Sequence, residues 1–589
     1  MAILLTRLAR VELARSFVRE VKNVIDSDTN KLYDYYNFAL SRTTAWTDEE
    51  SPETAYDSQK YINQFRNNIL FTQKVNPSDV CNLIRRIDWE EGTPENPSIY
   101  DAYDDDYSEN NPAPSGATTL ADAKFYVYTS ANRVYKCIEN RQLDPTESGF
   151  GNIVSSTYEP DRTTTDIFQT NDGYRWKFMY QVSEADQNKF LDTKYIPVRK
   201  LTTDSPAYGT LVGEVKSITV TNGGAGYTSA PKVYIQGDGT GARASATINE
   251  SGQVDSVTID SVNGETFEGL GYTFAFVQFT GGGDEEDENF RVAEAIVTLG
   301  DADPENTVLQ KAVENAAIEG TIERILVEDG GRDYVAGDTL VKITGDSVLS
   351  TDQAVATVTI AEGTGTITAI EITDVGANYN YADITFVDSN GDEIHTAEDD
   401  LSKKATARAI ISPIHGHGSN PVQELFSTTV GIVSSLSDNT NRDLMIDNDF
   451  RQIGLLKNIY DYDEQNIWRE ATATTCFIAN VSSSANYVID DIIVTDEGDA
   501  DEGRFRVIQT VESTATEGTF DIYLQSIIPN IKKASVLKNV TQDISSLTIN
   551  SVTDPEISTA YGEVIYIENR TSIARSTDQV ETIKAIVQF

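Results

Sequence analysis

The sequence is poor in the residues that build metal and redox sites. Its 589 residues include only three cysteines, three histidines and three methionines. Cys81, Cys137 and Cys476 are widely separated and odd in number, so we expect neither a disulfide framework nor a CxxC metal site. This usage fits a reducing compartment during assembly, and we expect no cofactor.

Long apolar runs and an excess of basic residues are also missing. No stretch reaches the roughly 18 uninterrupted apolar residues of a membrane span, and arginines interrupt the apolar N-terminus, so we expect neither membrane insertion nor a signal peptide. With 46 basic and 93 acidic residues the net charge is −47, which repels phosphate and makes nucleic-acid binding unlikely as a function. The acidic runs at 104–106 and 284–288 lack the glycine spacing of a calcium loop, and we expect solvated loops there.

The sequence lacks the short motifs of common enzyme sites. No Gly-Lys-Ser/Thr follows the glycine tracts at 223–226 and 281–283, and no Gly-x-Ser-x-Gly occurs. His415 and His417 are the only close histidine pair, but glycines follow both, so we predict a flexible turn and no metal site. We therefore expect the chain not to be an enzyme. A glycan-cleaving enzyme stays as an alternative, because some of the many carboxylates could face each other in a cleft.

The length predicts three to five domains, and 39% hydrophobic residues predict that they fold. Near the N-terminus, apolar residues recur at three- and four-residue steps, which predicts a helix over about 3–25. We expect this helix to pack on the chain's own β domain, with a partner's groove as the alternative. The apolar stripe consists of Leu4, Leu8, Val11, Ala14, Val18, Val21 and Ile25.

Most of the remaining chain alternates apolar and polar residues, which predicts a mainly β protein. A hairpin is expected around Ser130-Ala131-Asn132. The terminal strand at 582–589 must pair to be stable, and we expect it to close a sheet with N-terminal strands. Further strands are expected at 32–40, 172–180, 476–478, 487–489, 504–508, 520–524 and 562–570.

An internal repeat of about four copies occupies 210–412. Each copy has an apolar strand and then a glycine turn that ends in Tyr227, Tyr272, Tyr334 or Tyr379. The residue before each tyrosine is Gly, Gly, Asp or Asn, the types that best tolerate a positive φ angle. We expect small β modules that pair as two two-copy units on either side of the connection at 301–320. The alternative function is a receptor- or glycan-binding component that presents these tyrosine rings to sugars.

Four short motifs carry a family resemblance. They are Arg85-Arg86-Ile87-Asp88-Trp89, Tyr135-Lys136-Cys137, Asp172-Gly173-Tyr174-x-Trp176, and the ending Gly562 to Arg570 followed by Asp578-Gln579-x-Glu581. In type and order they resemble the baseplate wedge subunit, the gene-product-eight type, of T-even-like contractile-tail bacteriophages. The first motif has one residue more than that family's Arg-Arg-Asp-Trp. The block 210–412 has no counterpart in compact family members and resembles insertions of cyanophage-like versions.

The resemblance implies two β-sandwich-like domains, the second inserted in the first, and a homodimer inside the tail baseplate of the virion. Domain I would cover 1–92 and 413–589, domain II would cover 93–208, and the repeat modules would be inserted at 209–412. The implied partners are a second copy, other wedge subunits and tail-fibre attachment proteins. Assembly is expected in the host cytoplasm.

Two groups of motif residues are the candidate interface or structural cluster. The first group is Tyr566, Glu568, Asn569 and Arg570, for which a satisfied core turn is the alternative. The second group is Arg85, Arg86 and Trp89. We expect Trp89 and Trp176 to be core anchors and not platforms for a ligand.

Overall fold

The computed structural model describes most of the chain. The residues outside the description are 1–5, 22–33, 144–150, 202–214, 238–239, 263–264, 271, 273–274, 284–288, 300–303, 348, 350–351, 397–400, 437–447, 484–486, 501, 514–515, 543 and 575–580. The acidic run at 284–288 and the ends of the predicted N-terminal helix therefore lie outside the described residues.

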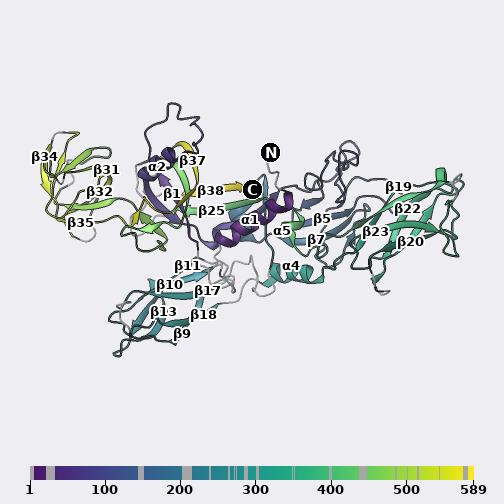
Figure 1. Ribbon diagram of the computed structural model, residues 1–589, viewed down its shortest axis with the longest axis horizontal. Coiled ribbons are helices and arrows are strands. Elements are labelled where there is room, and N and C mark those ends of the chain that lie inside the picture. The colour runs from purple at the N-terminus through teal and green to yellow at the C-terminus, as the bar shows by residue number, and fades with distance from the viewer. Residues whose placement is uncertain are drawn as a thin grey trace. The chain divides into compact units, whose positions relative to one another are not determined.

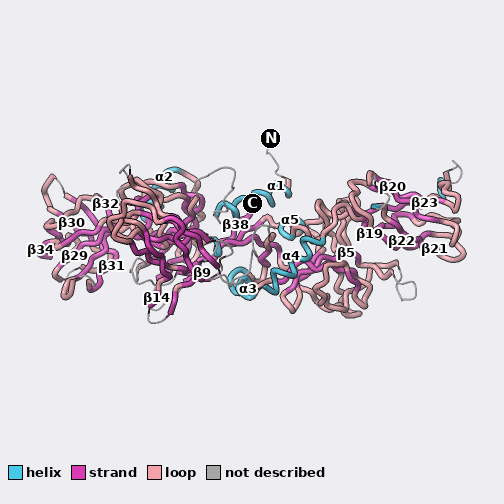
Figure 2. The backbone as a smooth tube through the Cα atoms, turned by 90° about the horizontal axis from the view of Figure 1, so that it is seen from below, coloured by secondary structure: helices cyan, strands magenta, loops and turns pink. Residues whose placement is uncertain are grey.

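The protein is mainly β, with 43% of its residues in strands and 10% in helices, as the sequence predicts. Figure 2 shows strands and loops throughout, with a few short helices. The chain folds into two compact units. Unit 1 consists of Met1–Ser16, Cys81–Gly431 and Ile586–Phe589, and unit 2 consists of Phe17–Val80 and Ile432–Ala585. The domain limits predicted at 92, 208 and 412 divide the chain more finely, and they stay a prediction.

Unit 2 contains an antiparallel sheet that joins the two ends of the chain. Its strand order is β28-β2-β1-β26-β37. Helix α2 (Gln59–Asn68) was not predicted from the sequence. It places Phe65 in the core, where a Cβ at Gly454 would collide with the Phe65 ring. The strands are β1 (Tyr36–Ser41), β2 (Ile69–Lys74), β26 (Asp449–Lys457), β28 (Thr472–Thr474) and β37 (Glu563–Ala574).

A second, seven-stranded sheet of unit 2 has its own core around Phe477, Phe505 and Leu524. Its strand order is β34-β33-β30-β31-β32-β29-β35. The strand predicted at 487–489 is wrong, since these residues form a turn and Tyr487 is buried beside the following strand. The strands are β29 (Phe477–Val481), β30 (Ile492–Thr495), β31 (Gly503–Glu512), β32 (Phe520–Ile528), β33 (Val536–Asn539), β34 (Ile544–Thr548) and β35 (Ser551–Thr553), with the small pair β27 (Tyr460–Asp461) and β36 (Ile557–Ser558) nearby in sequence.

Unit 1 is built around a four-stranded sheet that we call the aromatic sheet, with the order β4-β5-β7-β6. The predicted hairpin is confirmed: β4 (Tyr126–Tyr128) pairs with β5 (Arg133–Glu139), and Asn132 in the turn has a φ of 58°. The other strands of the sheet are β6 (Phe168–Gln169) and β7 (Arg175–Gln181). Further elements of unit 1 are β3 (Val80–Arg85), which pairs with β8 (Tyr195–Val198), and the helices α3 (Glu184–Phe190), α4 (Pro304–Ala316) and α5 (Pro421–Glu424), while η1 (Pro77–Asp79) belongs to unit 2.

Helix α4 comes from the connection between the repeat modules but lies beside β7 of the aromatic sheet (Figure 1). Its residue Val313 is completely buried in one core cluster with Tyr135, Trp176 and Phe178. The insertion therefore contributes to the core of the region into which it is inserted.

The repeat forms two modules of the same topology, each holding two of the four predicted copies. In both modules the first strand pairs with the last, the second with the fifth, and the third with the fourth. The first module has β9 (Val215–Asn222), β10 (Lys232–Gly237), β12 (Ala244–Ile248), β13 (Val254–Ile259), β17 (Ala275–Thr280) and β18 (Glu294–Leu299), with the short β11 (Thr240–Ala242), β14 (Ser261–Val262), β15 (Glu265–Thr266) and β16 (Glu268–Leu270). The second has β19 (Ile322–Asp329), β20 (Leu340–Gly345), β21 (Val355–Ile360), β22 (Ile367–Asp374), β23 (Ala382–Val387) and β24 (Thr406–Ile411), with η3 (Leu401–Lys403).

The tyrosine turns are the recurring structural unit of both modules. Asp333 and Asn378, which precede two of the tyrosines, have φ angles of 67° and 63°, as the residue types predict. Gly271 lies outside the described residues. The hydroxyl of Tyr334 accepts the backbone N–H of Ala405 at 2.8 Å, and that of Tyr379 accepts the N–H of Ala354 at 2.9 Å. Each tyrosine thus fastens its turn to a neighbouring strand.

The two ends of the chain differ from the sequence prediction in detail. Helix α1 (Arg7–Val21) buries Val11 against Ile84 and Phe125, so it packs on the chain's own β domain as expected. Leu8 of the predicted stripe is instead 49% exposed. Strand β38 (Glu581–Gln588) is an end strand of the sheet β38-β25-β3-β8, so it shares a sheet with the N-terminal strand β3 as expected, although its direct neighbour is β25 (Thr429–Leu436), which follows the insertion. Within the described residues, the helices are too short or too polar to cross a membrane.

Candidate functional site

Asn569 holds strand β37 to the rest of unit 2. Its side-chain oxygen accepts hydrogen bonds from the Tyr61 hydroxyl at 2.8 Å and from Gln452 Nε2 at 2.9 Å. Its amide nitrogen donates to the backbone oxygen of Glu53 at 2.7 Å. These contacts join α2, β26 and the 46–56 loop to β37, so the role of Asn569 is structural.

The other three residues of this group lie at the surface of β37, an end strand of its sheet. Tyr566 is 51% exposed, and Glu568 and Arg570 form an exposed ion pair at 3.1 Å. The backbone oxygen of Arg570 accepts the indole N–H of Trp46 at 2.7 Å, so the 46–56 loop covers this part of the strand edge. The alternative of a core turn is wrong, because the segment is a strand with exposed side chains.

Arg85, Arg86 and Trp89 lie in unit 1 and brace neighbouring segments. Arg85 donates to the backbone oxygen of Ala123 at 3.0 Å. Arg86 pairs with Asp88 at 2.8 Å and lies over the ring of Tyr128. These contacts tie the end of β3 to the aromatic sheet. The structure thus places the seven predicted residues in two groups, one in each compact unit, and not in one cluster.

Three of the four resemblance motifs meet in a single core. Tyr135 and Cys137 of the second motif and Trp176 of the third are completely buried in one cluster, against which Trp89 of the first motif packs. Both tryptophans are therefore core anchors. The indole N–H of Trp89 donates to Ser156 Oγ at 3.1 Å.

Buried ion pairs fix the second module to the aromatic sheet region. Arg324 on β19 lies 3.0 Å from Glu139 on β5, and both side chains are almost fully buried. Arg408 on β24 donates to both carboxylate oxygens of Asp104, at 2.9 and 2.7 Å. A two-point guanidinium–carboxylate contact fixes orientation as well as distance. Two ion pairs therefore join the second module to the aromatic sheet region within unit 1.

The repeat tyrosines do not present their rings to solvent. Tyr227, Tyr272, Tyr334 and Tyr379 are between 2% and 4% exposed, and each lies in the core of its own module. A sugar platform needs an accessible aromatic face. Glycan binding through these four rings is therefore excluded.

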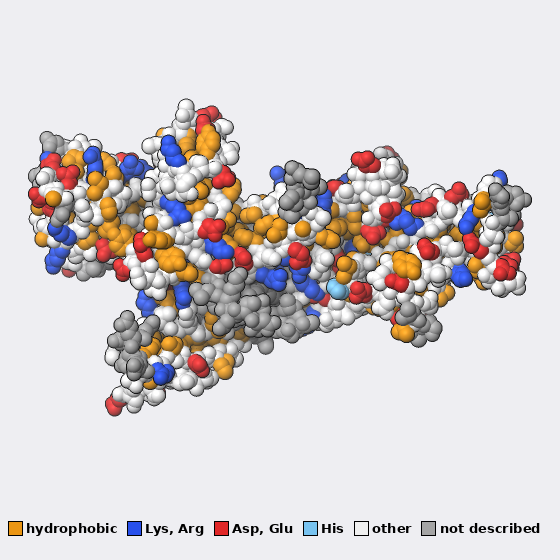
Figure 3. Space-filling model, viewed as in Figure 1, with side chains coloured by type: hydrophobic (Ala, Val, Ile, Leu, Met, Phe, Trp, Pro, Cys, Tyr) orange, Lys and Arg blue, Asp and Glu red, His pale blue; other side chains and the backbone are white. Residues whose placement is uncertain are grey.

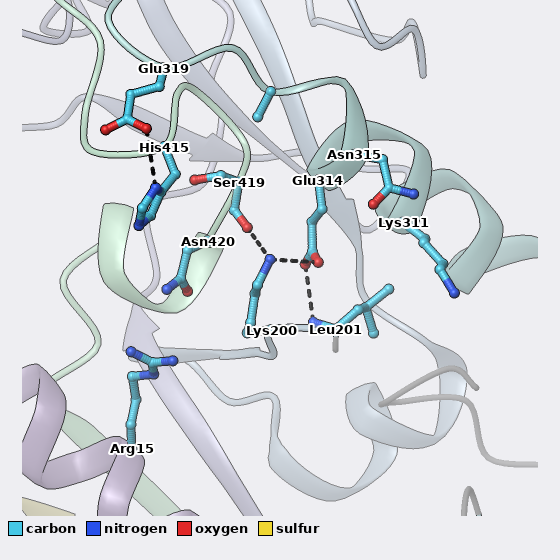
Figure 4. Close-up of a pocket in the computed structure, with 11 residues that line it drawn as sticks. Arg15, Lys200, Leu201, Lys311, Glu314, Asn315, Glu319, His415, Ser419 and Asn420 are labelled. Carbon is cyan, nitrogen blue, oxygen red and sulfur yellow. Dashed lines mark hydrogen bonds and ion pairs between the residues drawn. The ribbon is translucent and has the colours of Figure 1, made fainter. Parts of the chain in front are cut away.

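Unit 1 has an open polar cleft of about 600 Å³ between α1, α4 and the turn at 415–420 (Figure 4). Lys200 lies at its centre, where it pairs with Glu314 at 2.9 Å and donates to the backbone oxygen of Ser419. Glu314 also accepts the N–H of Leu201 at 3.1 Å, and burial raises the pKa of its carboxyl. The lining residues are Arg15, Lys200, Leu201, Lys311, Glu314, Asn315, Ala317, Glu319, His415, Ser419 and Asn420.

The two carboxylates of this cleft do not form a facing pair. Glu314 points to Lys200 and the backbone of Leu201, and Glu319 points to His415, at 3.5 Å (Figure 4). A glycosidase needs one carboxyl as acid and another as base or nucleophile across the scissile bond. Since Glu314 is directed at Lys200 and Glu319 at His415, the cleft gives no support to that chemistry.

A second polar group is completely buried beside the cleft. Lys136 on β5 lies 2.9 Å from Glu424 Oε2 and 2.8 Å from His417 Nδ1. The side chains of Lys136 and Glu424 are 0% and 2% exposed. Burial, followed by the charges of Lys136 and Lys177, lowers the pKa of His417 well below its usual range, so its ring is neutral and Nδ1 accepts from the ammonium.

The two histidines of the His-Gly-His-Gly segment have separate surroundings. His415 is exposed and pairs with Glu319, while His417 is buried against the Tyr103 ring. The segment is a turn as predicted, but its burial around His417 contradicts the expectation that it is flexible. Among the described residues, no group of three or more His, Cys, Asp or Glu side chains could hold a metal ion.

Charge at the surface is mixed despite the net charge of −47. On the face in Figure 3, acidic side chains are scattered among basic and apolar ones and do not merge into one acidic area.

Sequence reasoning missed Lys136, Glu424, Arg324 and Arg408. Each is a charged residue inside an apolar strand or beside one, which is the available signal, because charges are rarely buried without a partner. The partners lie far away along the chain, for example 288 residues from Lys136 to Glu424, and no sequence pattern identifies them.

Comparison with known proteins gives no assignment: no family model and no curated protein matches the chain.

Proposed function

We propose that the chain is a structural baseplate wedge protein of a contractile phage tail, acting as a homodimer that binds neighbouring wedge subunits. It would have no catalytic role and would transmit the rearrangement of the baseplate through its β domains. Its partners would be a second copy, other wedge subunits and tail-fibre attachment proteins. Its place would be the tail baseplate of the virion.

One observation carries this proposal. Trp89, Tyr135, Cys137 and Trp176, from three motifs that resemble the wedge family, lie in one hydrophobic core. Motifs shared by chance have no reason to converge in space, whereas motifs shared because they build a common fold do. The convergence therefore supports the resemblance on which the function rests.

Ion pairs that join the second module to the aromatic sheet region agree with a role in transmitting force. The Arg324–Glu139 and Arg408–Asp104 pairs fix the second module to the aromatic sheet region. A receptor-binding role through the repeat tyrosines lacks support, because their rings are buried. A glycan-cleaving role lacks support from the cleft at Lys200, where Glu314 is paired with Lys200 and Glu319 with His415.

The proposal is tested by locating the chain in the particle. Antibodies against the purified protein should label the baseplate in electron micrographs of intact virions, and a low-resolution map should place it in the wedges. Labelling of fibre tips would favour the receptor-binding alternative, and labelling of the capsid or no labelling would reject a tail function.

The oligomeric state is tested separately on the purified full-length chain. Light scattering should report twice the 64.8 kDa of the single chain. Replacing Tyr566 by Glu examines the exposed group on β37, with Tyr158→Glu as a control at a similarly exposed tyrosine of unit 1. Dissociation by the first change alone would place β37 in the dimer interface. A monomeric wild-type chain at micromolar concentration would reject the homodimer.

A further inference from the structure

The buried group around Lys136 has the geometry of a reaction site. Lys136 Nζ contacts Glu424 Oε2 at 2.9 Å, and the carboxyl carbon of Glu424 lies one bond further. The ring of Tyr103 covers the amine, with Nζ 4.0 Å from the ring centroid. The side chains of Lys136 and Glu424 are both closed off from water. A nucleophile and an electrophile are thus held together in a dry core.

The carboxyl group of Glu424 also receives backbone hydrogen bonds. The N–H of Gly418 donates to its two oxygens at 2.9 and 3.0 Å, and the N–H of Asn420 donates to Oε1 at 3.0 Å. Donors arranged in this way stabilise negative charge on the carboxyl oxygens, both in the carboxylate of the ion pair and in the oxyanion that forms when an amine attacks the carbon.

His417 completes the arrangement as a proton acceptor. Its Nδ1 lies 2.8 Å from Lys136 Nζ, and its ring is neutral. Burial also lowers the pKa of Lys136, which favours the uncharged amine that is needed for attack. Two close, fixed reactants in one molecule reach effective concentrations of roughly 10⁵ M or more, so even a sluggish condensation becomes feasible over the lifetime of a protein.

We propose that Lys136 and Glu424 form an intramolecular amide, an isopeptide bond, in the mature protein. Lys136 Nζ passes a proton to the paired Glu424 carboxylate and then attacks Cδ of the resulting carboxylic acid, and the N–C bond forms. His417 Nδ1 takes a proton from the attacking nitrogen and returns it to the departing hydroxyl. The C–O bond breaks and one water molecule leaves. No oxidant, metal or other reactant is needed.

Removal of two buried charges supplies a driving force for the bond. A buried ion pair must offset the desolvation of both ions, whereas a neutral amide in the same place has no such penalty. The bond would close a loop that contains both repeat modules, because their strands all lie between residues 136 and 424.

The test is a mass measurement on the denatured full-length protein. The wild-type chain is expected to be lighter than its sequence by one water molecule. A tryptic digest should contain one branched peptide that joins the segments around Lys136 and Glu424, with no cleavage after Lys136. A wild-type chain of full sequence mass, with normal cleavage after Lys136, would mean an ion pair only and would overturn the proposal.

Two variants assign the bond. Glu424→Leu should restore the full mass. Lys177→Met is the matched control, because Lys177 is the cross-strand neighbour of Lys136 and is also buried but donates to the backbone oxygen of Thr165. The Lys177→Met variant should still be lighter than its sequence by one water molecule. A Lys177→Met chain of full sequence mass would contradict the assignment of the bond to Lys136. The mass of the wild-type chain alone shows whether the bond is present, so the proposal can be rejected even if a variant fails to fold.

Discussion

Arg324 on β19 and Glu139 on β5 form an almost fully buried ion pair with an N–O distance of 3.0 Å. The pair connects a strand of the second repeat module to a strand of the aromatic sheet. If one of the two residues were removed, the charge of the other would be buried where water cannot solvate it.

Replacing Glu139 by Gln should destabilise unit 1 by about 3–5 kcal/mol, because Arg324 would keep a buried charge without a counter-ion. Thermal unfolding followed by circular dichroism measures this change. The double variant Glu139→Leu with Arg324→Met should recover most of the loss. Lys404→Gln is the control, since its pair with Glu393 is exposed and should cost less than about 1 kcal/mol. Equal effects of Glu139→Gln and the control would contradict the prediction.

Replacing Tyr334 by Phe should destabilise the second module by about 1–3 kcal/mol. The change removes only the hydroxyl and leaves the buried N–H of Ala405 without its 2.8 Å acceptor. Limited proteolysis with mapped cleavage sites measures the effect locally. If the variant is as resistant as the wild type, the tyrosine hydroxyl has no role in closing the module.

Gly331→Ala should be more damaging than Gly337→Ala in the same module. Both glycines have positive φ angles, 55° and 84°, so both changes carry the strain of a left-handed residue, about 1–2 kcal/mol. A Cβ at Gly331 would in addition collide with the backbone oxygen of Lys403, whereas Gly337 has open space around it. A difference of about 1–3 kcal/mol in unfolding free energy is expected from this collision. Equal effects would show that the close approach relaxes without cost.

Asn569→Ala should destabilise unit 2 by about 2 kcal/mol, because it removes the hydrogen bonds from Tyr61 and Gln452 and the one to Glu53. Its neighbour Arg570 is the control, since its side chain pairs only with the exposed Glu568, and Arg570→Ala should change stability by less than about 0.5 kcal/mol. Denaturant unfolding followed by fluorescence gives both values. A larger effect at Arg570 would reverse the assigned roles.

Lys74 gives a pH-dependent prediction for unit 2. Burial lowers the pKa of Lys74 from 10.5 to about 8. Between these two values the unfolded chain binds more protons than the folded one, so the unfolding free energy contributed by this group rises with pH across that window. Below pH 8 the lysine is charged in both states and its burial is unfavourable throughout.

Lys74→Met should therefore stabilise unit 2 at pH 7, by up to about 2 kcal/mol, and should remove the rise between pH 8 and 10.5. Melting temperatures of both proteins at several pH values provide the measurement. A variant that is less stable than wild type at pH 7 would show that the contact of Lys74 with the Tyr35 ring outweighs its desolvation.

Local patterns predicted the local structure well. The hairpin of β4 and β5 has alternating apolar residues and a turn residue, Asn132, that accepts a positive φ angle, so everything it needs is contained in 14 residues. The tyrosine turns were predictable for the same reason. Helix α2 was missed because Tyr61, Ile62 and Phe65 provide too short an apolar stripe to stand out from a polar loop.

Long-range contacts could not be predicted from the chain. The surroundings of Lys136 depend on His417 and Glu424, which are 281 and 288 residues away, and nothing near Lys136 indicates them. The same holds for β38, where the sequence requires a partner strand but does not choose between β25 and the N-terminal strands. The choice of a partner strand depends on how the whole unit packs. The periodicity of the sequence carries no information about that packing.

Helix α4 determines when the core of the aromatic sheet region can be completed during synthesis of the chain. The core around Trp176 is complete only when Val313 reaches it, so the ribosome must synthesise most of the insertion first. At a synthesis rate of about 5–20 residues per second, the unfinished core waits on the order of 10 s with part of its apolar surface uncovered. Excising 210–412 would therefore leave a cavity in this core at the place of Val313.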